Sequence, residues 1–143
     1  IILLMKISYI SNSSCPSELP SSLQIVKTCE YLSKYGNKVR LIIPNTAVVN
    51  LSIEEFYDVK FKFDIIRLSR FKKFPIGIDY YLFSFLAFLN AIKMSDLIIT
   101  RNYFVVFLCS LFRKKCVIEL HGDISNESRT VRFIFNIFKV LNS

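Results

Sequence analysis

Hydrophobic and polar positions alternate along the chain in blocks that predict strands and helices in turn. Short aliphatic and β-branched runs, each bounded by polar or turn residues, predict strands at 5–11, 38–43, 63–68, 97–100 and 116–120. Apolar residues at helical spacing predict longer helices at 21–35, 78–93, 102–112 and 129–141. Alternating strands and helices are typical of a parallel sheet covered on both faces. The expected fold is therefore α/β, a Rossmann-like three-layer domain with a parallel sheet of about five strands.

Several residues predict where the helices begin and end. Ser21 and Gln24 have the spacing of a capping box, so the first helix is expected to have Ser21 as its N-cap. Gly36 predicts the end of that helix, because glycine adopts the left-handed conformation of a helix stop at little cost. Ser52 and Glu55 repeat the capping-box spacing and predict a second, short helix.

Polar side chains gather where the predicted strands end. The loop at 11–20 is longer than the roughly two to six residues of an ordinary strand-to-helix connection, which favours a functional loop. Arg101 and Asn102 follow the fourth strand directly, and Glu119 and His121 stand at the end of the fifth. The carboxyl ends of parallel strands border the usual ligand crevice, so these residues are expected to share one cleft. Asn102 also has the position of a helix cap. For Arg101 a second interpretation stays open, a partly exposed arginine paired with a carboxylate.

His121 is the only histidine, and it would share one strand face with Glu119. A lone histidine is often structural, but the end of a strand favours a substrate hydrogen bond or a proton-linked contact near neutral pH. A zinc site is not favoured, because no second histidine exists and no cysteine spacing suits a metal. The sequence has no G-x-G-x-x-G, P-loop or G-x-S-x-G motif, so no cofactor is expected.

Composition supports one folded domain. With 143 residues, 52% of them apolar and 21% charged, the chain is long enough to bury a layered core, and residues 1–143 are taken as a single domain. The four cysteines are expected to be buried free thiols in a reducing cytosol. The apolar window at 74–92 contains Asp79 and Asn90, so a buried or interfacial helix is favoured over a membrane span.

The positive charge suggests an anionic partner. Lysine and arginine outnumber aspartate and glutamate by 19 to 11, which suits a phosphorylated substrate, an acidic membrane or nucleic acid. The densest basic stretch carries Arg67, Arg70, Lys72 and Lys73 with aromatic residues between them. It is either a solvated loop or a surface for anionic lipid or a phosphate-bearing acceptor, each basic residue then contributing about 1 kcal/mol. Nucleic acid is not favoured, because the basic residues are dispersed and no recognition motif occurs.

Five segments together resemble the N-terminal half of retaining glycosyltransferases of the GT-B type, a large family with many bacterial polysaccharide and lipopolysaccharide transferases. The segments span 5–11, 21–30, 35–39, 95–101 and 117–122, and the resemblance covers nearly the whole chain. It implies an acceptor-binding domain that faces a nucleotide-sugar-binding domain across a cleft. Transfer would pass through an oxocarbenium-like state, with the leaving diphosphate stabilised electrostatically and no metal required.

The resemblance also implies roles for single residues. His121 would be the catalytic residue beside the donor sugar. Close to the donor and its phosphates would lie Pro20, Ser21, Ser22 and Gly122, and the acceptor side would be shaped by Arg101, Asn102 and Glu119. One departure concerns the loop after the first strand, where many relatives carry a Gly-Gly pair and this chain has Leu19-Pro20-Ser21-Ser22. That departure puts the close approach of backbone to ligand in question.

The resemblance further implies that a C-terminal donor-binding domain with paired glutamates is absent from residues 1–143. The chain alone is then expected to be inactive, as a gene fragment, a degraded gene or one partner of a split enzyme. The complete enzyme would be cytoplasmic and peripheral on the inner face of the plasma membrane, and would use a nucleotide sugar and a glycan or lipid-linked acceptor. The alternative is a non-catalytic Rossmann-like binding module or subunit that docks on a membrane or on a catalytic partner.

Overall fold

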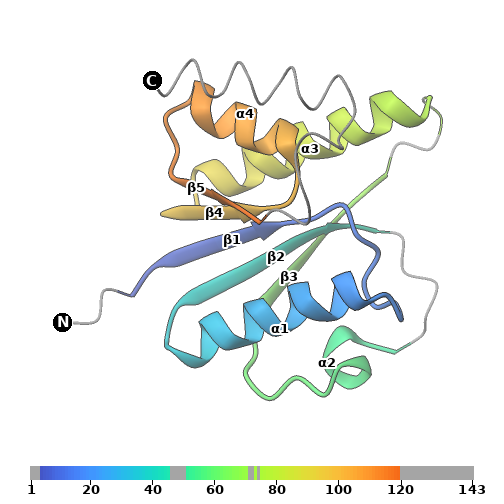
Figure 1. Cartoon of the computed structure of the whole chain (residues 1–143), viewed down its shortest axis with the longest axis vertical. Coiled ribbons are helices and arrows are strands. Elements are labelled where there is room, and N and C mark those ends of the chain that lie inside the picture. Colours follow the sequence, from blue (N-terminus) through green and yellow to red (C-terminus); the bar gives the residue numbers. More distant parts are fainter. Residues whose placement is uncertain (1–3, 46–50, 71–72, 74, 120–143) are drawn as a thin grey trace.

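The structure, a computed structural model, describes residues 4–45, 51–70, 73 and 75–119 (Figure 1). Within them, strands and helices alternate as β1 (Lys6–Ile10), α1 (Pro20–Lys34), β2 (Lys38–Pro44), α2 (Ile53–Phe56), β3 (Asp64–Leu68), α3 (Ile76–Ile92), β4 (Leu97–Thr100), α4 (Tyr103–Leu111) and β5 (Cys116–Ile118). The sheet has the order β3-β2-β1-β4-β5, and every neighbouring pair is parallel. The predicted α/β fold with five parallel strands is confirmed. The helix predicted at 129–141 lies outside the described residues.

The helices cover the sheet in two layers. Figure 1 shows α1 and α2 on one face and α3 and α4 on the other. The chain builds β1, β2 and β3 outward in one direction, then returns through α3 to place β4 on the other side of β1. The strand order therefore reverses between β1 and β4. In open α/β sheets the carboxyl ends of the strands at such a reversal border the ligand crevice.

Alternating side chains of the central strands divide the core between the two faces. Tyr9 and Leu41 pack with the buried residues of α1, whereas Ile10 and Ile42 pack with those of α3 and α4. All four side chains have no exposed surface. Strands buried on both faces are typical of parallel sheets, which explains why the carboxyl-terminal parts of β1 and β2 are apolar on both faces. The four cysteines are free, as predicted, and Cys15, Cys29 and Cys109 are buried, whereas Cys116 is only partly buried.

Most of the predicted helix boundaries are confirmed. Gly36 follows α1 with a φ of +89°, in the left-handed region that favours glycine. The side chain of Ser52 accepts a hydrogen bond from the backbone N–H of Glu55, and the side chain of Glu55 reaches back to complete the capping box. The predicted N-cap at Ser21 is wrong, because α1 begins at Pro20 and has Leu19 as its N-cap. Proline suits the first helical position, since its φ is already helical and its missing N–H would have no partner there.

The apolar helix α3 buries only one of its sides. Phe83 and Phe88 are buried against the sheet, while Ile78, Phe85 and Leu89 on the outer side are 42–47% exposed. Among the described helices, none combines the length and the hydropathy needed to cross a membrane.

Candidate functional site

The candidate site lies at the carboxyl edge of the sheet, where β1, β4 and β5 end. Arg101 follows β4, and Glu119 follows β5. The backbone N–H of Glu119 donates to the carbonyl of Thr100 at 3.0 Å and so continues the sheet pairing. Tyr9, near the end of β1, reaches toward the same point. Neighbouring strands thus deliver three polar side chains to one place because β4 lies between β1 and β5.

Glu119 is the acceptor that joins these side chains. Its Oε2 accepts the Tyr9 hydroxyl at 2.6 Å and the Nε of Arg101 at 3.0 Å. The side chains of Arg101 and Glu119 are only 16% and 28% exposed, so water weakens their attraction less than it weakens a surface ion pair. Burial, reinforced by the hydrogen bond to Glu119 and by its negative charge, raises the pKa of Tyr9, which keeps the phenol protonated as a donor. For Arg101 the structure supports the interpretation of an arginine paired with a carboxylate.

Arg101 also connects β4 to the first turn of α1. Its Nη1 donates to the Ser21 carbonyl at 3.5 Å and its Nη2 to the side-chain oxygen of Gln24 at 3.2 Å. Gln24 was expected to close a capping box, but it binds the guanidinium instead. Three predicted site residues, Ser21, Arg101 and Glu119, are therefore brought together by one guanidinium.

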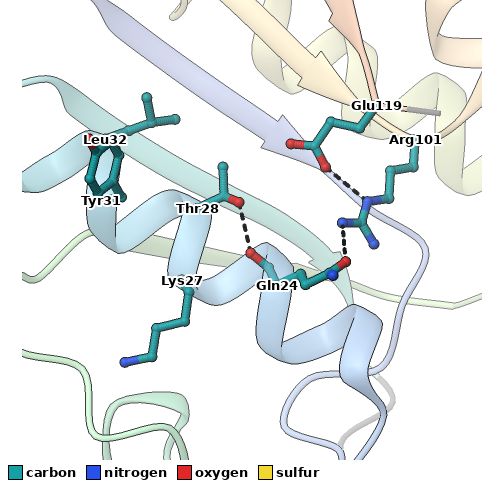
Figure 2. A pocket seen from close by; sticks show the side chains of 7 residues that line it. All are labelled: Gln24, Lys27, Thr28, Tyr31, Leu32, Arg101 and Glu119. Carbon is teal, nitrogen blue, oxygen red and sulfur yellow. Dashed lines mark hydrogen bonds and ion pairs between the residues drawn. The ribbon is translucent and has the colours of Figure 1, made fainter. Parts of the chain in front are cut away.

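A hollow of about 550 Å³ opens beside this group, and its size suits a small-molecule ligand. It is lined by Gln24, Lys27, Thr28, Tyr31, Leu32, Arg101 and Glu119. Figure 2 shows the side chains of α1 along one wall, with Arg101 and Glu119 at the end nearest the strands. Lys27 points away from Arg101 in this view, and its amine pairs with Glu30 at 2.8 Å. The hollow therefore combines amide, hydroxyl and carboxylate groups and the two paired cations Lys27 and Arg101 with the ring of Tyr31, which is 59% exposed.

Asn102 is a buried structural centre beside this hollow. Its side-chain oxygen accepts the backbone N–H groups of Phe104 and Val105, which confirms the expected helix cap, and it also accepts the hydroxyl of Tyr80. Its amide nitrogen donates to Asn12 at 2.6 Å and to Ser84 at 2.5 Å. Asn102 is only 3% exposed, so its amide fixes the start of α4 and holds the loop after β1 in place.

The residues at the start of α1 differ in their accessibility. Ser22 is fully buried, and its hydroxyl donates to the Ser14 carbonyl at 3.0 Å and accepts from Ser17 at 2.7 Å. Pro20 opens the helix and has no N–H to offer. Ser21 is only partly buried and contributes its carbonyl to Arg101. This turn is thus tied to the loop before it and to β4.

The basic stretch does not form one open cationic surface in the described part of the chain. Arg67 donates to the Cys15 carbonyl at 3.0 Å, so it holds the loop after β1. Arg70 pairs with the nearly buried carboxylate of Asp79 at 2.6 Å. Lys73 is exposed. Lys72 lies outside the described residues.

His121 and Gly122, the predicted catalytic and phosphate-proximal residues, also lie outside the described residues. Sequence reasoning did not identify Thr28 and Tyr31 as lining residues, although their three-residue spacing places them on one side of a helix. Tyr9 was missed because its role depends on the neighbouring strands. Among the described residues, no group of three or more histidine, cysteine, aspartate or glutamate side chains could hold a metal.

Comparisons of the chain with protein-family models, with curated proteins and with solved structures gave no match.

Proposed function

We propose that this chain is the acceptor-side half of a retaining glycosyltransferase of the GT-B type. The complete enzyme would transfer a sugar from a nucleotide-sugar donor to a cell-surface glycan or a lipid-linked acceptor, and the chain alone would be inactive. The observation that carries this proposal is the meeting of Arg101, Glu119 and the first turn of α1 beside a hollow at the carboxyl edge of β1 and β4.

Two features support this assignment. The hollow lies by the reversal of strand order, where open α/β sheets bind their ligands. Two of the three residues that the resemblance assigns to the acceptor side, Arg101 and Glu119, line the hollow. The third, Asn102, lies just behind them and positions the start of α4.

The charge balance of the hollow suits a neutral acceptor rich in hydroxyl groups. Arg101 and Glu119 neutralise each other, so neither presents a free charge. Gln24 and Thr28 offer an amide and a hydroxyl. The exposed ring of Tyr31 offers an apolar face against which the C–H groups of a sugar can pack.

The remaining roles follow the resemblance. His121, two residues beyond Glu119, would contact the donor sugar, and the first turn of α1 with Gly122 would face the donor phosphates. The second domain would supply most donor contacts. We place the enzyme at the cytoplasmic face of the plasma membrane, which is supported by the net charge of +8 and by the exposed apolar side of α3.

Calorimetric titration tests whether the donor-binding site lies in the second domain. The 143-residue chain and a chain extended into the sequence encoded downstream are each titrated with a panel of nucleotide sugars and with free UDP and GDP. Nucleotide sugars, which have no terminal phosphoryl group, are expected to bind the extended chain only. Tight binding of a nucleotide sugar by the short chain would contradict the proposed function and would favour a complete nucleotide-binding module.

Substitutions in the extended chain test the acceptor hollow, the hollow of about 550 Å³ lined by α1, Arg101 and Glu119. Tyr31→Ala is expected to raise the KM for the acceptor with an unchanged KM for the donor, because the ring of Tyr31 lines the hollow proposed for the acceptor. Leu23→Ala is the control, since Leu23 is an exposed residue of the same helix (44%) and does not line the hollow. His121→Ala is expected to lower kcat tenfold or more, and wild-type turnover in that variant would remove its catalytic role.

A further inference from the structure

A second group of charged side chains lies at the amino edge of the sheet, where β1 and β2 begin, opposite the arrowheads in Figure 1. Lys6 opens β1 and Lys38 opens β2, and the two are direct partners in the parallel register. Arg40 lies two residues further along β2. Together with Asp64 of β3 and Met94, just beyond α3, these residues line a hollow of about 230 Å³.

The three cationic residues occupy the same face of the sheet. Ile10 and Ile42 pack against α3 and α4, and Lys6 and Arg40 precede them by even numbers of residues on their strands. Side chains alternate along a strand, so these cations point to the α3 side. Arg40 confirms this placement, because its Nη2 donates to the side-chain oxygen of Asn90 on α3 at 3.1 Å.

Within the described residues, Lys6 and Lys38 are exposed and unpaired, and Arg40 is only partly paired. The amines of Lys6 and Lys38 make no hydrogen bond or ion pair there, and neither does the carboxylate of Asp64. The Nη1 of Arg40 is buried and has no hydrogen-bond partner among the described residues. A buried cationic donor without an acceptor is unfavourable, and so is the mutual repulsion of three cations around one small space.

Neighbouring groups relieve this cost only in part. The carboxyl end of α3 lies close by, and the negative end of a helix dipole favours cations. It does not supply an acceptor for Nη1 of Arg40. Asp96 lies at the same edge, but its Oδ2 accepts the backbone N–H of Lys6 at 2.8 Å. An added anion would pair with the exposed amines of Lys6 and Lys38 and would place negative charge beside the guanidinium of Arg40.

We propose that Lys6, Lys38 and Arg40 bind a phosphate group at the amino edge of the sheet. A guanidinium matches two phosphate oxygens, and ammonium groups add compact positive charge. Three cations facing one carboxylate favour a dianion over a singly charged carboxylate ligand. The hollow is smaller than the roughly 300–1,000 Å³ of pockets for drug-sized ligands, so it suits a phosphoryl group rather than a whole nucleotide. This site lies at the edge opposite the acceptor hollow and does not depend on glycosyl transfer.

Titration of the 143-residue chain with inorganic phosphate and with pyrophosphate, at an ionic strength held constant with chloride, tests the site. Saturable binding of one anion per chain is expected. The double variant Lys6→Ala/Lys38→Ala is expected to weaken binding tenfold or more. The matched control is Lys34→Ala/Lys60→Ala, which removes two exposed lysines that do not line this hollow and should change the affinity less than twofold.

The phosphate can come from a soluble compound or from a lipid head group, and a vesicle arm distinguishes these sources. Flotation with phosphatidylcholine vesicles is compared with flotation after phosphatidylglycerol is added. Binding of free phosphate supports a soluble source. Vesicle binding that requires Lys6 and Lys38, without binding of free phosphate, supports a lipid head group. Absence of both, or binding that the double variant retains in full, would overturn the site. Circular dichroism checks that each variant is folded.

Discussion

The arginines at the two ends of the sheet differ in how completely their guanidinium groups are hydrogen-bonded. At the carboxyl edge, Arg101 directs its guanidinium to Glu119, Gln24 and the Ser21 carbonyl. At the amino edge, Arg40 directs one nitrogen to Asn90 and leaves the other buried without a partner among the described residues. Arg40 lies in β2 and Arg101 directly follows β4, the two strands that flank β1.

This difference shows that positive charge alone does not mark a binding site. A guanidinium whose donors are satisfied inside the protein stabilises the fold and leaves a neutral surface. A guanidinium with an unused buried donor has free energy to gain from an added acceptor. The acceptor hollow is therefore expected to favour neutral ligands, and the amino edge is expected to favour anions.

The largest effect is expected from Asn102, which organises the carboxyl edge. Asn102→Ala removes the cap of α4 and leaves Tyr80, Ser84 and Asn12 short of a buried partner. We expect a loss of roughly 3 kcal/mol in the free energy of unfolding, measured by urea denaturation. Asn45→Ala, at an exposed asparagine, is the control and should stay within about 0.5 kcal/mol of wild type. Equal stability of the two variants would contradict the structural role of Asn102.

A smaller loss is expected from Arg101→Met. Methionine retains much of the apolar contact but leaves Glu119 without its cationic partner, so we expect roughly 1–2 kcal/mol of destabilisation. Chemical denaturation at low and high salt measures it. A stability equal to wild type would mean that the pair contributes nothing to the carboxyl edge.

Glu30 is a buried carboxylate whose two oxygens both accept hydrogen bonds. Burial acts to raise the pKa of Glu30, but hydrogen bonds from Lys27 and from the backbone N–H groups of Lys60 and Phe61 lower it overall. The stabilisation is therefore present above the unfolded pKa of about 4.3 and is lost as pH falls through the lower folded pKa. Relative to Glu30→Gln, we expect an advantage on the order of 1 kcal/mol at pH 7. Denaturation between pH 7 and pH 2 should show that advantage disappear in acid, and a pH-independent difference would contradict the assignment.

The smallest effect is expected from Arg40→Met, measured in phosphate-free buffer. The substitution removes a hydrogen bond to Asn90 but also removes a buried donor that has no partner among the described residues, so the two changes offset each other. We expect a stability within about 1 kcal/mol of wild type. A loss as large as that of Arg101→Met would mean that the two arginines have the same structural role.

The sequence predicted the elements better than it predicted the site. The strand at 97–100 has the predicted bounds, and the predicted capping box of Ser52 and Glu55 is present. Both features depend on residues that are close together in the sequence. The bond between Tyr9 and Glu119 joins residues 110 positions apart, and it requires β4 to lie between β1 and β5. The pairing of Lys6 with Lys38 likewise depends on strand register, which local patterns do not fix.

The most direct test of the difference between the two edges is a titration of the ¹⁵N-labelled chain with pyrophosphate, followed by amide chemical shifts. We expect saturable shifts at Lys6, Lys38, Arg40 and Asp64, and unchanged shifts at Ser21, Arg101 and Glu119. Shifts concentrated at the start of α1 and at Arg101 would contradict it, because they would place anion recognition at the carboxyl edge.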